Sequence, residues 1–134
     1  MLRVRVEAPC HPTESLAKVK LALLRLFPDL TFEREDDRVV GTAASLSTLR
    51  EMIRNQRIRD AARGQFLAGR FGDRTHVALS KQAAFMGVVN FSAGSPLGDI
   101  EVEIESDDLT AVLDDVAEST VRPRVTPSGR SGGT

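Results

Sequence analysis

The stretch LGDIEVEIES, residues 97–106, alternates aliphatic and acidic side chains with a strict period of two. Such alternation is typical of a β-strand that buries one face and exposes the other. Ile100, Val102 and Ile104 are expected to face the core, and the carboxylates between them to face water. The stretch LRVRVEA, residues 2–8, has the same period. Together the two stretches predict a sheet with one apolar face and one charged face.

Three segments of the chain have the apolar spacing of amphipathic helices. Thr13 is a suitable N-cap for the first, which Pro28 is expected to end. Thr48 and Glu51 have the spacing of a capping box at the start of the second. Asp107 is the expected cap of the third. Helices of this kind can bury their apolar faces against one face of a sheet.

The remaining patterns predict further strands. Residues 31–43 are expected to form a hairpin, and 76–79 and 84–91 two strands joined by a turn or a short helix. The order is then β-α-β-β-α-β-β-β-α, which predicts an α+β fold with a mainly antiparallel mixed sheet and helices packed on one face. We expect residues 1–120 to form a single α+β domain and the Pro-, Gly-, Ser- and Arg-rich residues 121–134 to be a disordered tail.

Charge is segregated along this chain of 134 residues, although its net charge is only −1. Residues 48–70 contain six arginines and two acids, a net charge of +4. Residues 99–118 contain nine acids and no base, a net charge of −9. Opposite blocks of this kind can attract each other within one fold or across two subunits, and the basic block can attract an outside polyanion.

The sequence favours a cytoplasmic location. No apolar run approaches the roughly 18 residues of a membrane span, and the charged N-terminal stretch does not have the pattern of a signal peptide. Cys10 is the only cysteine, so it cannot form an internal disulfide.

The arginines of the second helix fall on two faces, and its apolar face changes direction as well. At 100° per residue, Arg54 and Arg57 lie nearly opposite Arg59 and Arg63. A helix bent or broken near Asn55, or buried on two sides, would explain the change. The arginines could be a solvated, salt-bridged surface, could pair with acids of another subunit, or could bind phosphate.

Other kinds of site are disfavoured. GQFLAGRF, residues 64–71, resembles a phosphate-binding loop, but Arg70 and Phe71 stand where lysine and a hydroxyl are required. Gly69 and Gly72 are better explained as a helix C-cap and a turn residue.

Metal and catalytic constellations are equally weak in the sequence. Cys10, His11 and His76 are too few and too scattered for a closed zinc site. The acids of residues 99–105 are explained as the solvent side of a strand. Phe85 and Phe91 are expected to pack in the core, because too few aromatics are present for a base-stacking platform.

Several stretches together resemble an archaeal family known as uncharacterised protein family 201. They are VRVEAPCHPTES at the N-terminus, QRIRDAAR in the second helix, KQAAFMGVVNF, and LGDIEVEIESDDL. The resemblance implies a small α+β protein that looks like the large-subunit ribosomal protein that binds 5S ribosomal RNA, and it implies a homodimer. It supplies no catalytic residues.

We therefore expect a non-enzymatic, homodimeric protein that associates with structured RNA in the ribosome or in RNA processing, with no cofactor and no small-molecule substrate. The alternative is a protein-interaction module whose arginine helix serves dimer or partner contacts. An enzyme would need a pocket that gathers His76, Lys81, Gln82 and an acid. The residues expected to contact phosphate are Arg54, Arg57, Arg59, Arg63 and Lys81.

Overall fold

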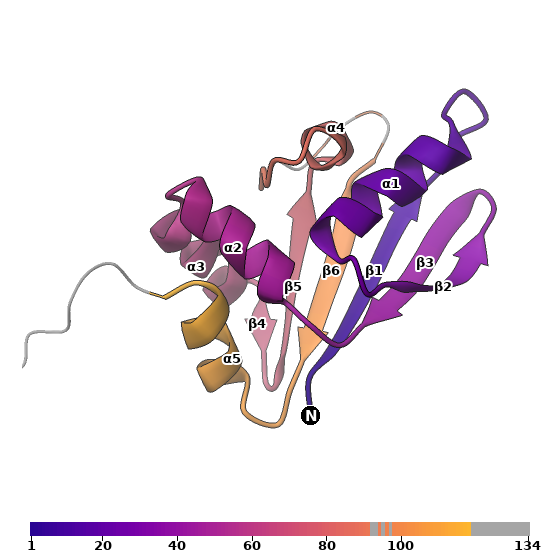
Figure 1. The fold of residues 1–134 in the computed structure, drawn as a ribbon. Coiled ribbons are helices and arrows are strands. Elements are labelled where there is room, and N and C mark those ends of the chain that lie inside the picture. Colours follow the sequence, from indigo (N-terminus) through magenta and orange to yellow (C-terminus); the bar gives the residue numbers. More distant parts are fainter. Residues whose placement is uncertain (92–93, 95, 97, 119–134) are drawn as a thin grey trace, which may run out of the picture.

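The fold is that of a computed structural model, which describes residues 1–91, 94, 96 and 98–118 (Figure 1). The segment expected to be a disordered tail, residues 121–134, lies outside the described residues.

One antiparallel sheet organises the chain. Its strands are β1 (Arg3–Pro9), β2 (Thr31–Glu35), β3 (Arg38–Ala43), β4 (Arg70–Phe71), β5 (Arg74–Leu79) and β6 (Ile100–Glu105). They lie side by side in the order β2-β3-β1-β6-β5-β4, and each pair is antiparallel. The α+β class is confirmed, and the sheet expected to be mixed is antiparallel throughout. The two alternating stretches predicted as strands are its central pair, with Val6 opposite Val102.

Helices cover one face of this sheet (Figure 1). They are α1 (Leu16–Leu26), α2 (Ser47–Asn55), α3 (Arg59–Ala68), α4 (Lys81–Phe85) and α5 (Leu109–Val116). The aliphatic side chains of β1 and β6 are buried beneath them together with Leu23, Phe27 and Phe66. The predicted placement of helices on one face of a sheet is confirmed, and the charged side chains of the strands are left on the opposite, open face.

The arginine-rich segment is two helices, so the break near Asn55 is the alternative, among those left open by its apolar face, that the structure shows. In α2 the buried residues are Leu49 and Ile53, and in α3 they are Ala62 and Phe66. The break at residues 56–58 lets each half turn its own apolar face to the core. The capping box predicted at Thr48 is wrong. Helix α2 begins at Ser47, its N-cap is Leu46, and no side chain makes a capping hydrogen bond there.

Two further caps differ by one or two positions from the prediction. Ser15, not Thr13, caps α1, and its Oγ accepts a hydrogen bond from the Lys18 N–H at 3.3 Å. Asp108, not Asp107, caps α5. In both cases a side chain one or two positions away has the same capping chemistry, so composition alone does not choose between them. Pro28 follows the end of α1, as predicted.

The strand predicted over 84–91 is wrong. Ser80 Oγ accepts a hydrogen bond from the Ala83 N–H at 3.2 Å, which starts the short helix α4. Gly87 then turns the chain with φ of 78°. The preceding strand β5 already has β4 and β6 as neighbours, so the predicted strand has no place beside it.

Gly69 and Gly72 occupy the positions predicted for them. Gly69 is the C-cap of α3, and Gly72 lies in the turn between β4 and β5 with φ of 65°. Gly69 is also required by packing, because a Cβ there would lie 2.0 Å from the carbonyl oxygen of His76. Gly64, within α3, would meet nothing within 4 Å.

Gly69→Ala is expected to lower the free energy of unfolding by about 2 kcal/mol or more, because the backbone of β5 must move to admit a methyl group. The matched control, Gly64→Ala, is expected to raise it by about 0.5–1 kcal/mol, because alanine favours an exposed helical position. Urea unfolding of the two variants measures both changes. Equal effects at the two positions would contradict the close approach at Gly69.

Candidate nucleic-acid interface

The turn between α2 and α3 has the hydrogen-bond pattern of a Schellman motif. The Arg57 N–H donates to the Arg54 carbonyl at 3.1 Å, and the Ile58 N–H donates to the Ile53 carbonyl at 3.1 Å. Gln56 is the C-cap, so Arg57 follows it at the position where helices most often place a left-handed glycine. Ile58 and Ile53 both belong to the apolar interior, as the motif prefers.

Arg57 adopts the left-handed conformation, with φ of 58°, and is the sole non-glycine among the described residues with positive φ. That conformation costs a non-glycine residue about 1–2 kcal/mol. A strained residue at an exposed turn is an observation that points to a role for its side chain. No pattern in the sequence predicts this strain, because arginine at a helix end is common.

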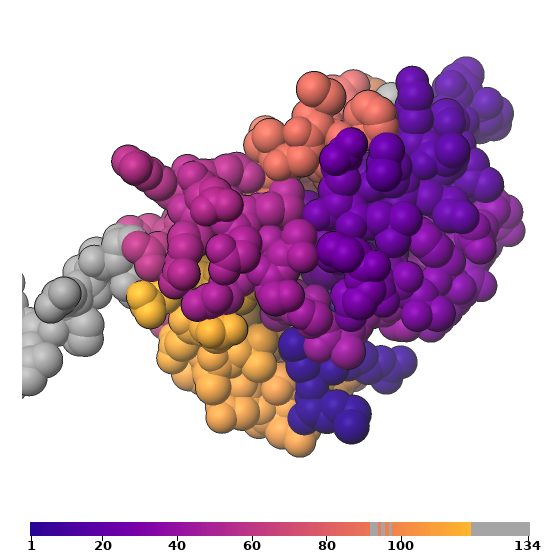
Figure 2. Space-filling view, in the orientation of Figure 1, coloured from indigo at the N-terminus to yellow at the C-terminus, as the bar shows by residue number. Residues whose placement is uncertain are grey.

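Three arginines of the basic segment are paired with acids of α5 or of the residues just after it. The ion pairs are Arg50 with Asp115 at 3.5 Å, Arg59 with Glu118 at 3.4 Å, and Arg63 with Asp114 at 2.7 Å. Figure 2 shows the magenta surface of α2 and α3 directly beside the orange-yellow surface of α5. The attraction between opposite charge blocks that the sequence suggested therefore occurs within one chain.

These ion pairs do not hold α5 in place by themselves. The arginine side chains are 27–32% exposed and the acids 54–72% exposed, and pairs of this kind contribute about 0.2–1 kcal/mol each. Burial of Leu109, Leu113 and Val116 anchors the helix. The main effect of the carboxylates is to reduce the positive potential at Arg50, Arg59 and Arg63.

Arg54 and Arg57 are exposed, and their side chains have no ion-pair or hydrogen-bond partner within the part of the chain that the structure describes. They line a surface hollow of about 520 Å³ together with Ile58, Arg59 and Asp60. This hollow has the size of a small-ligand site. Its lining contains three arginines. They are the strained Arg57, the unpaired Arg54, and Arg59, whose ion pair with Glu118 is partly exposed and therefore weak.

Lys81, the fifth residue expected to contact phosphate, lies apart from these arginines in a buried ion pair. Its side chain is 8% exposed, and its Nζ donates to Glu14 at 2.9 Å and to the Pro9 carbonyl at 2.9 Å. Burial acts to raise the pKa of the Glu14 carboxyl, but the His11 backbone N–H and Lys81 outweigh it and lower that pKa. This arrangement directs Lys81 into the fold.

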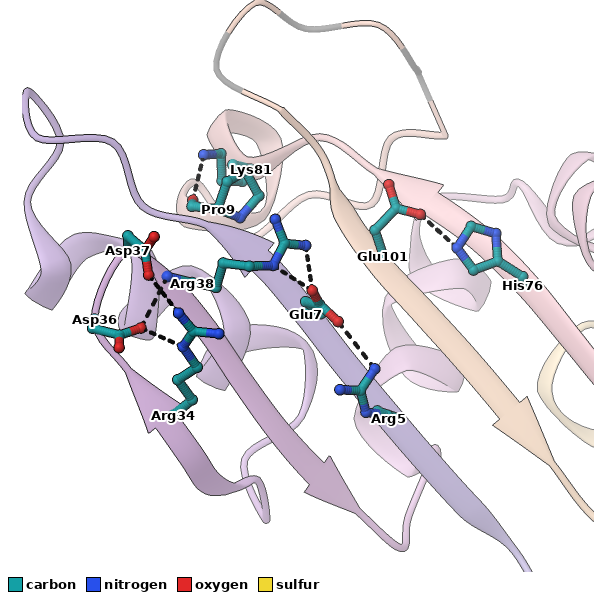
Figure 3. A network of polar contacts seen from close by, with 10 residues as sticks. All are labelled: Arg5, Glu7, Pro9, Arg34, Asp36, Asp37, Arg38, His76, Lys81 and Glu101. Atoms are coloured by element: carbon teal, nitrogen blue, oxygen red, sulfur yellow. Dashed lines mark hydrogen bonds and ion pairs between the residues drawn. The ribbon is translucent and has the colours of Figure 1, made fainter.

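The open face of the sheet carries mixed charges instead of a basic surface (Figure 3). Glu7 lies between Arg5 and Arg38 and is paired with both, and His76 contacts Glu101 on the neighbouring strand. The pKa of Glu7 is lowered overall. Burial acts to raise it, but the guanidinium groups of Arg38 and Arg5 outweigh that effect. The acids of β6 are the partly exposed side of a strand, as predicted.

Arg74 of β5 also pairs with two of the β6 acids, Glu103 at 3.7 Å and Glu105 at 3.6 Å. The bases of this face are thus interleaved with carboxylates, which weakens any attraction for phosphate.

The constellation that would support an enzyme is not brought together. Lys81, Gln82 and Glu14 line one groove, whereas His76 lies on the open face of the sheet. Over the described residues, no cluster of three or more His, Cys, Asp or Glu could hold a metal ion. None of the described helices has the length and apolar character needed to cross a membrane.

One contact at the turn had no signal in the sequence. The Gln56 side chain donates to the Val89 carbonyl at 2.9 Å and accepts from the Val89 N–H at 2.8 Å. The two bonds fasten the turn between α2 and α3 to the loop that follows α4. A glutamine in a polar helix end looks like an ordinary surface residue, so only the fold reveals this role.

Comparison with known proteins adds a family. A family model described as RNA binding matches residues 3–106. A UPF0201 protein of Thermococcus kodakarensis is 46% identical over 112 residues, which cover 78% of this chain and 81% of that protein. A UPF0201 protein of Methanothermobacter thermautotrophicus is 42% identical and covers 92% of this chain and 96% of its own. The crystal structure of a UPF0201 protein from Methanococcus jannaschii superposes on this chain with a TM-score of 0.82. The two sequences are 34% identical, and the match covers 89% of this chain and 95% of that protein.

Arg57→Gly is expected to raise the free energy of unfolding by up to about 1 kcal/mol, because glycine adopts φ of 58° without steric cost. Arg54→Gly is the matched control. It is expected to lower stability by about 1 kcal/mol, because Arg54 is within α2. Thermal and urea unfolding measure both. Destabilisation by Arg57→Gly would show that the arginine side chain supports the fold itself.

Proposed function

The chain belongs to the UPF0201 family, and we propose that it is a non-enzymatic cytoplasmic protein that binds structured RNA through the turn between α2 and α3. Arg54 and Arg57 are the primary phosphate contacts. Arg59 and Arg63 are secondary contacts, because their weak ion pairs with α5 must be exchanged for phosphate. The RNA-binding description of the matched family model supports the class of ligand.

The observation that carries this proposal is the conformation of Arg57. Glycine would satisfy the same backbone at lower cost, so the arginine side chain needs another reason to be there. It projects from an exposed turn next to Arg54, which also lacks a partner among the described residues. Guanidinium groups bind phosphate oxygens in a bidentate manner, so two adjacent arginines suit a folded RNA backbone.

The position of α5 explains how an acidic protein could bind a polyanion. Asp115 and Asp114 of α5 and Glu118 just after it neutralise part of the basic segment, at Arg50, Arg63 and Arg59. The positive potential is then concentrated at Arg54 and Arg57. Phosphate contact at this turn is favoured, while the rest of the surface repels non-specific polyanion binding.

The alternative remains a protein-interaction module that uses its arginine helix in dimer or partner contacts. Pairing of three arginines with acids of the same chain leaves less charge for an acidic partner to neutralise. Under this alternative, loss of Arg54 and Arg57 would dissociate a protein complex and leave RNA binding absent in every variant.

We also propose that the protein is a homodimer. Its contact includes Leu67, at the end of α3, and Phe71, on the edge strand β4. Phe71 is 89% exposed and Leu67 is 47% exposed. A large aromatic side chain at the edge of a sheet is stabilised when it is buried against a second copy. A two-fold axis would bury two such rings in one contact.

Arg54→Ala/Arg57→Ala is expected to weaken binding of a structured RNA at least tenfold, and to reduce the slope of log affinity against log salt by about two. The measurement is fluorescence anisotropy with labelled transfer RNA and a ribosomal RNA fragment at several salt concentrations.

The matched control, Arg34→Ala/Arg74→Ala, also removes two exposed arginines, but both are paired with acids in the native fold. It is expected to bind RNA within about twofold of the wild type. An equal loss in both double variants would sink the assignment to the turn, and absence of wild-type binding even at low salt would sink the RNA function.

Phe71→Ser is expected to convert the dimer to a monomer, because each dimer loses two buried rings worth about 2 kcal/mol each. The dissociation constant should rise roughly a thousandfold. Analytical ultracentrifugation measures it. Met86→Ser, which removes another exposed apolar side chain, is the control and should leave the dimer unchanged. A monomeric wild type, or a Phe71→Ser dimer of undiminished affinity, would contradict the proposed contact.

A further inference from the structure

A groove of about 560 Å³ lies between α1 and α4, and its lining includes no residue of the turn between α2 and α3. In Figure 2 the surfaces of these two helices lie side by side, α1 in purple and α4 in salmon. Residues lining it include Lys18, Val19 and Ala22 from α1 and Gln82, Phe85 and Met86 from α4. Its volume is that of a site for one small organic group, such as a nucleotide.

Two cations flank the aromatic side chain of this groove. The Lys18 Nζ and the Arg25 guanidinium carbon each lie 5.9 Å from the centre of the Phe85 ring. Lys18, Ala22 and Arg25 are spaced along one face of α1. Ala22, which lies between the two cations along α1, also lines the groove, and the Phe85 ring is half-buried.

Nothing in the groove opposes an anion. Glu14 is the acid in its lining, and Lys81 neutralises it through a buried pair. α1 itself carries Lys18, Lys20 and Arg25 and no acid. Among the described residues, Lys18 and Arg25 pair with no carboxylate, so the mouth of the groove has a net positive charge.

A polar group suited to a base edge is also present. Gln82 is exposed, and its side-chain amide has no hydrogen-bond partner in the described part of the chain. An amide supplies one acceptor and two donor hydrogens, which match the Watson–Crick edge of an unpaired base. Aromatic stacking, flanking cations and a free amide together are the chemistry with which proteins bind single nucleotides of RNA.

We propose that the groove between α1 and α4 receives one unpaired nucleotide of the bound RNA. The base stacks on Phe85, its edge bonds to Gln82, and Lys18 and Arg25 contact the adjoining phosphates. The inference rests on the proposed RNA function and deepens it, because it makes the ligand a structured RNA with a flipped-out or loop nucleotide.

The two surfaces are physically connected. Gln56, in the turn that presents Arg57, is bonded through both amide atoms to Val89 in the loop after α4. A duplex backbone held at Arg54 and Arg57 would therefore lie next to the loop that leads to Phe85. Met86 and Val88, which follow Phe85 in the chain, have exposed side chains.

The test compares two labelled RNAs of equal duplex length, one closed by an unpaired loop and one blunt. The wild type is expected to bind the looped RNA about tenfold more tightly, the effect of one stacked base. Phe85→Leu, which keeps the apolar packing and removes the aromatic face, is expected to abolish this preference and leave blunt-duplex binding unchanged. Phe91→Leu is the matched control. The Phe91 ring packs against the Phe66 ring, with 6.0 Å between the ring centres, and it does not line the groove. Circular dichroism checks that both variants are folded.

Each other result overturns the inference. If wild type and Phe85→Leu bind both RNAs with the same relative affinity, the groove takes no nucleotide, although the RNA function and its arginine turn stand. If the wild type binds neither RNA, the proposed function and this inference fail together. If Phe85→Leu changes the sedimentation of the dimer and not the preference for a loop, the groove is a protein contact.

Discussion

The antiparallel pairing of β1 with β6 is the constraint on which the rest of the molecule depends. It joins residues about a hundred positions apart in the sequence and places Val4 opposite Ile104 and Val6 opposite Val102. Because the side chains of a strand alternate, this register fixes which face is apolar. Every helix must then pack on that face, and the arginines and glutamates of the strands are left on the other, where they neutralise one another. The sheet therefore offers little to a polyanion, and the helical layer is where a binding surface can form.

Within the helical layer, two devices decide where positive charge is available. The break after α2 presents Arg57 from a turn that glycine would fit better. Carboxylates of α5 and of Glu118 just after it lie against Arg50, Arg59 and Arg63. The ion pairs are weak in stability, but they are strong enough to shape the surface potential. A protein of net charge −1 can in this way keep a small basic surface and limit binding elsewhere. The same layer contains the groove at Phe85, joined to the turn through Gln56.

The sequence predicted those features that have a repeating pattern. Period-two alternation identified the central strands, and the hairpin followed from its turn. The change of apolar face near Asn55 indicated a bend, a break or burial on two sides, and the structure shows the break. Predictions failed where one local contact outweighed propensity. A short helix before residue 84 was one expected alternative, but it continues to Phe85 and Gly87 then turns the chain, so the strand predicted over 84–91 does not form. Nearby capping residues could not be ranked. The fate of Lys81 depended on Glu14, 67 positions away, and no pattern in the sequence connects those two residues. The opposite charge blocks in the sequence predicted an attraction, but they did not indicate which arginines would pair with the acids of residues 114–118.

The most direct test of this account is a map of amide chemical shifts in ¹⁵N-labelled protein during titration with a structured RNA. The account predicts changes that are concentrated in residues 18–25, 54–60 and 81–90, with little change for the amides of β1, β5 and β6. Changes centred on the open face of the sheet, or on the exposed acids of α5, would contradict the claim that the strained turn at Arg57 is the RNA-binding surface.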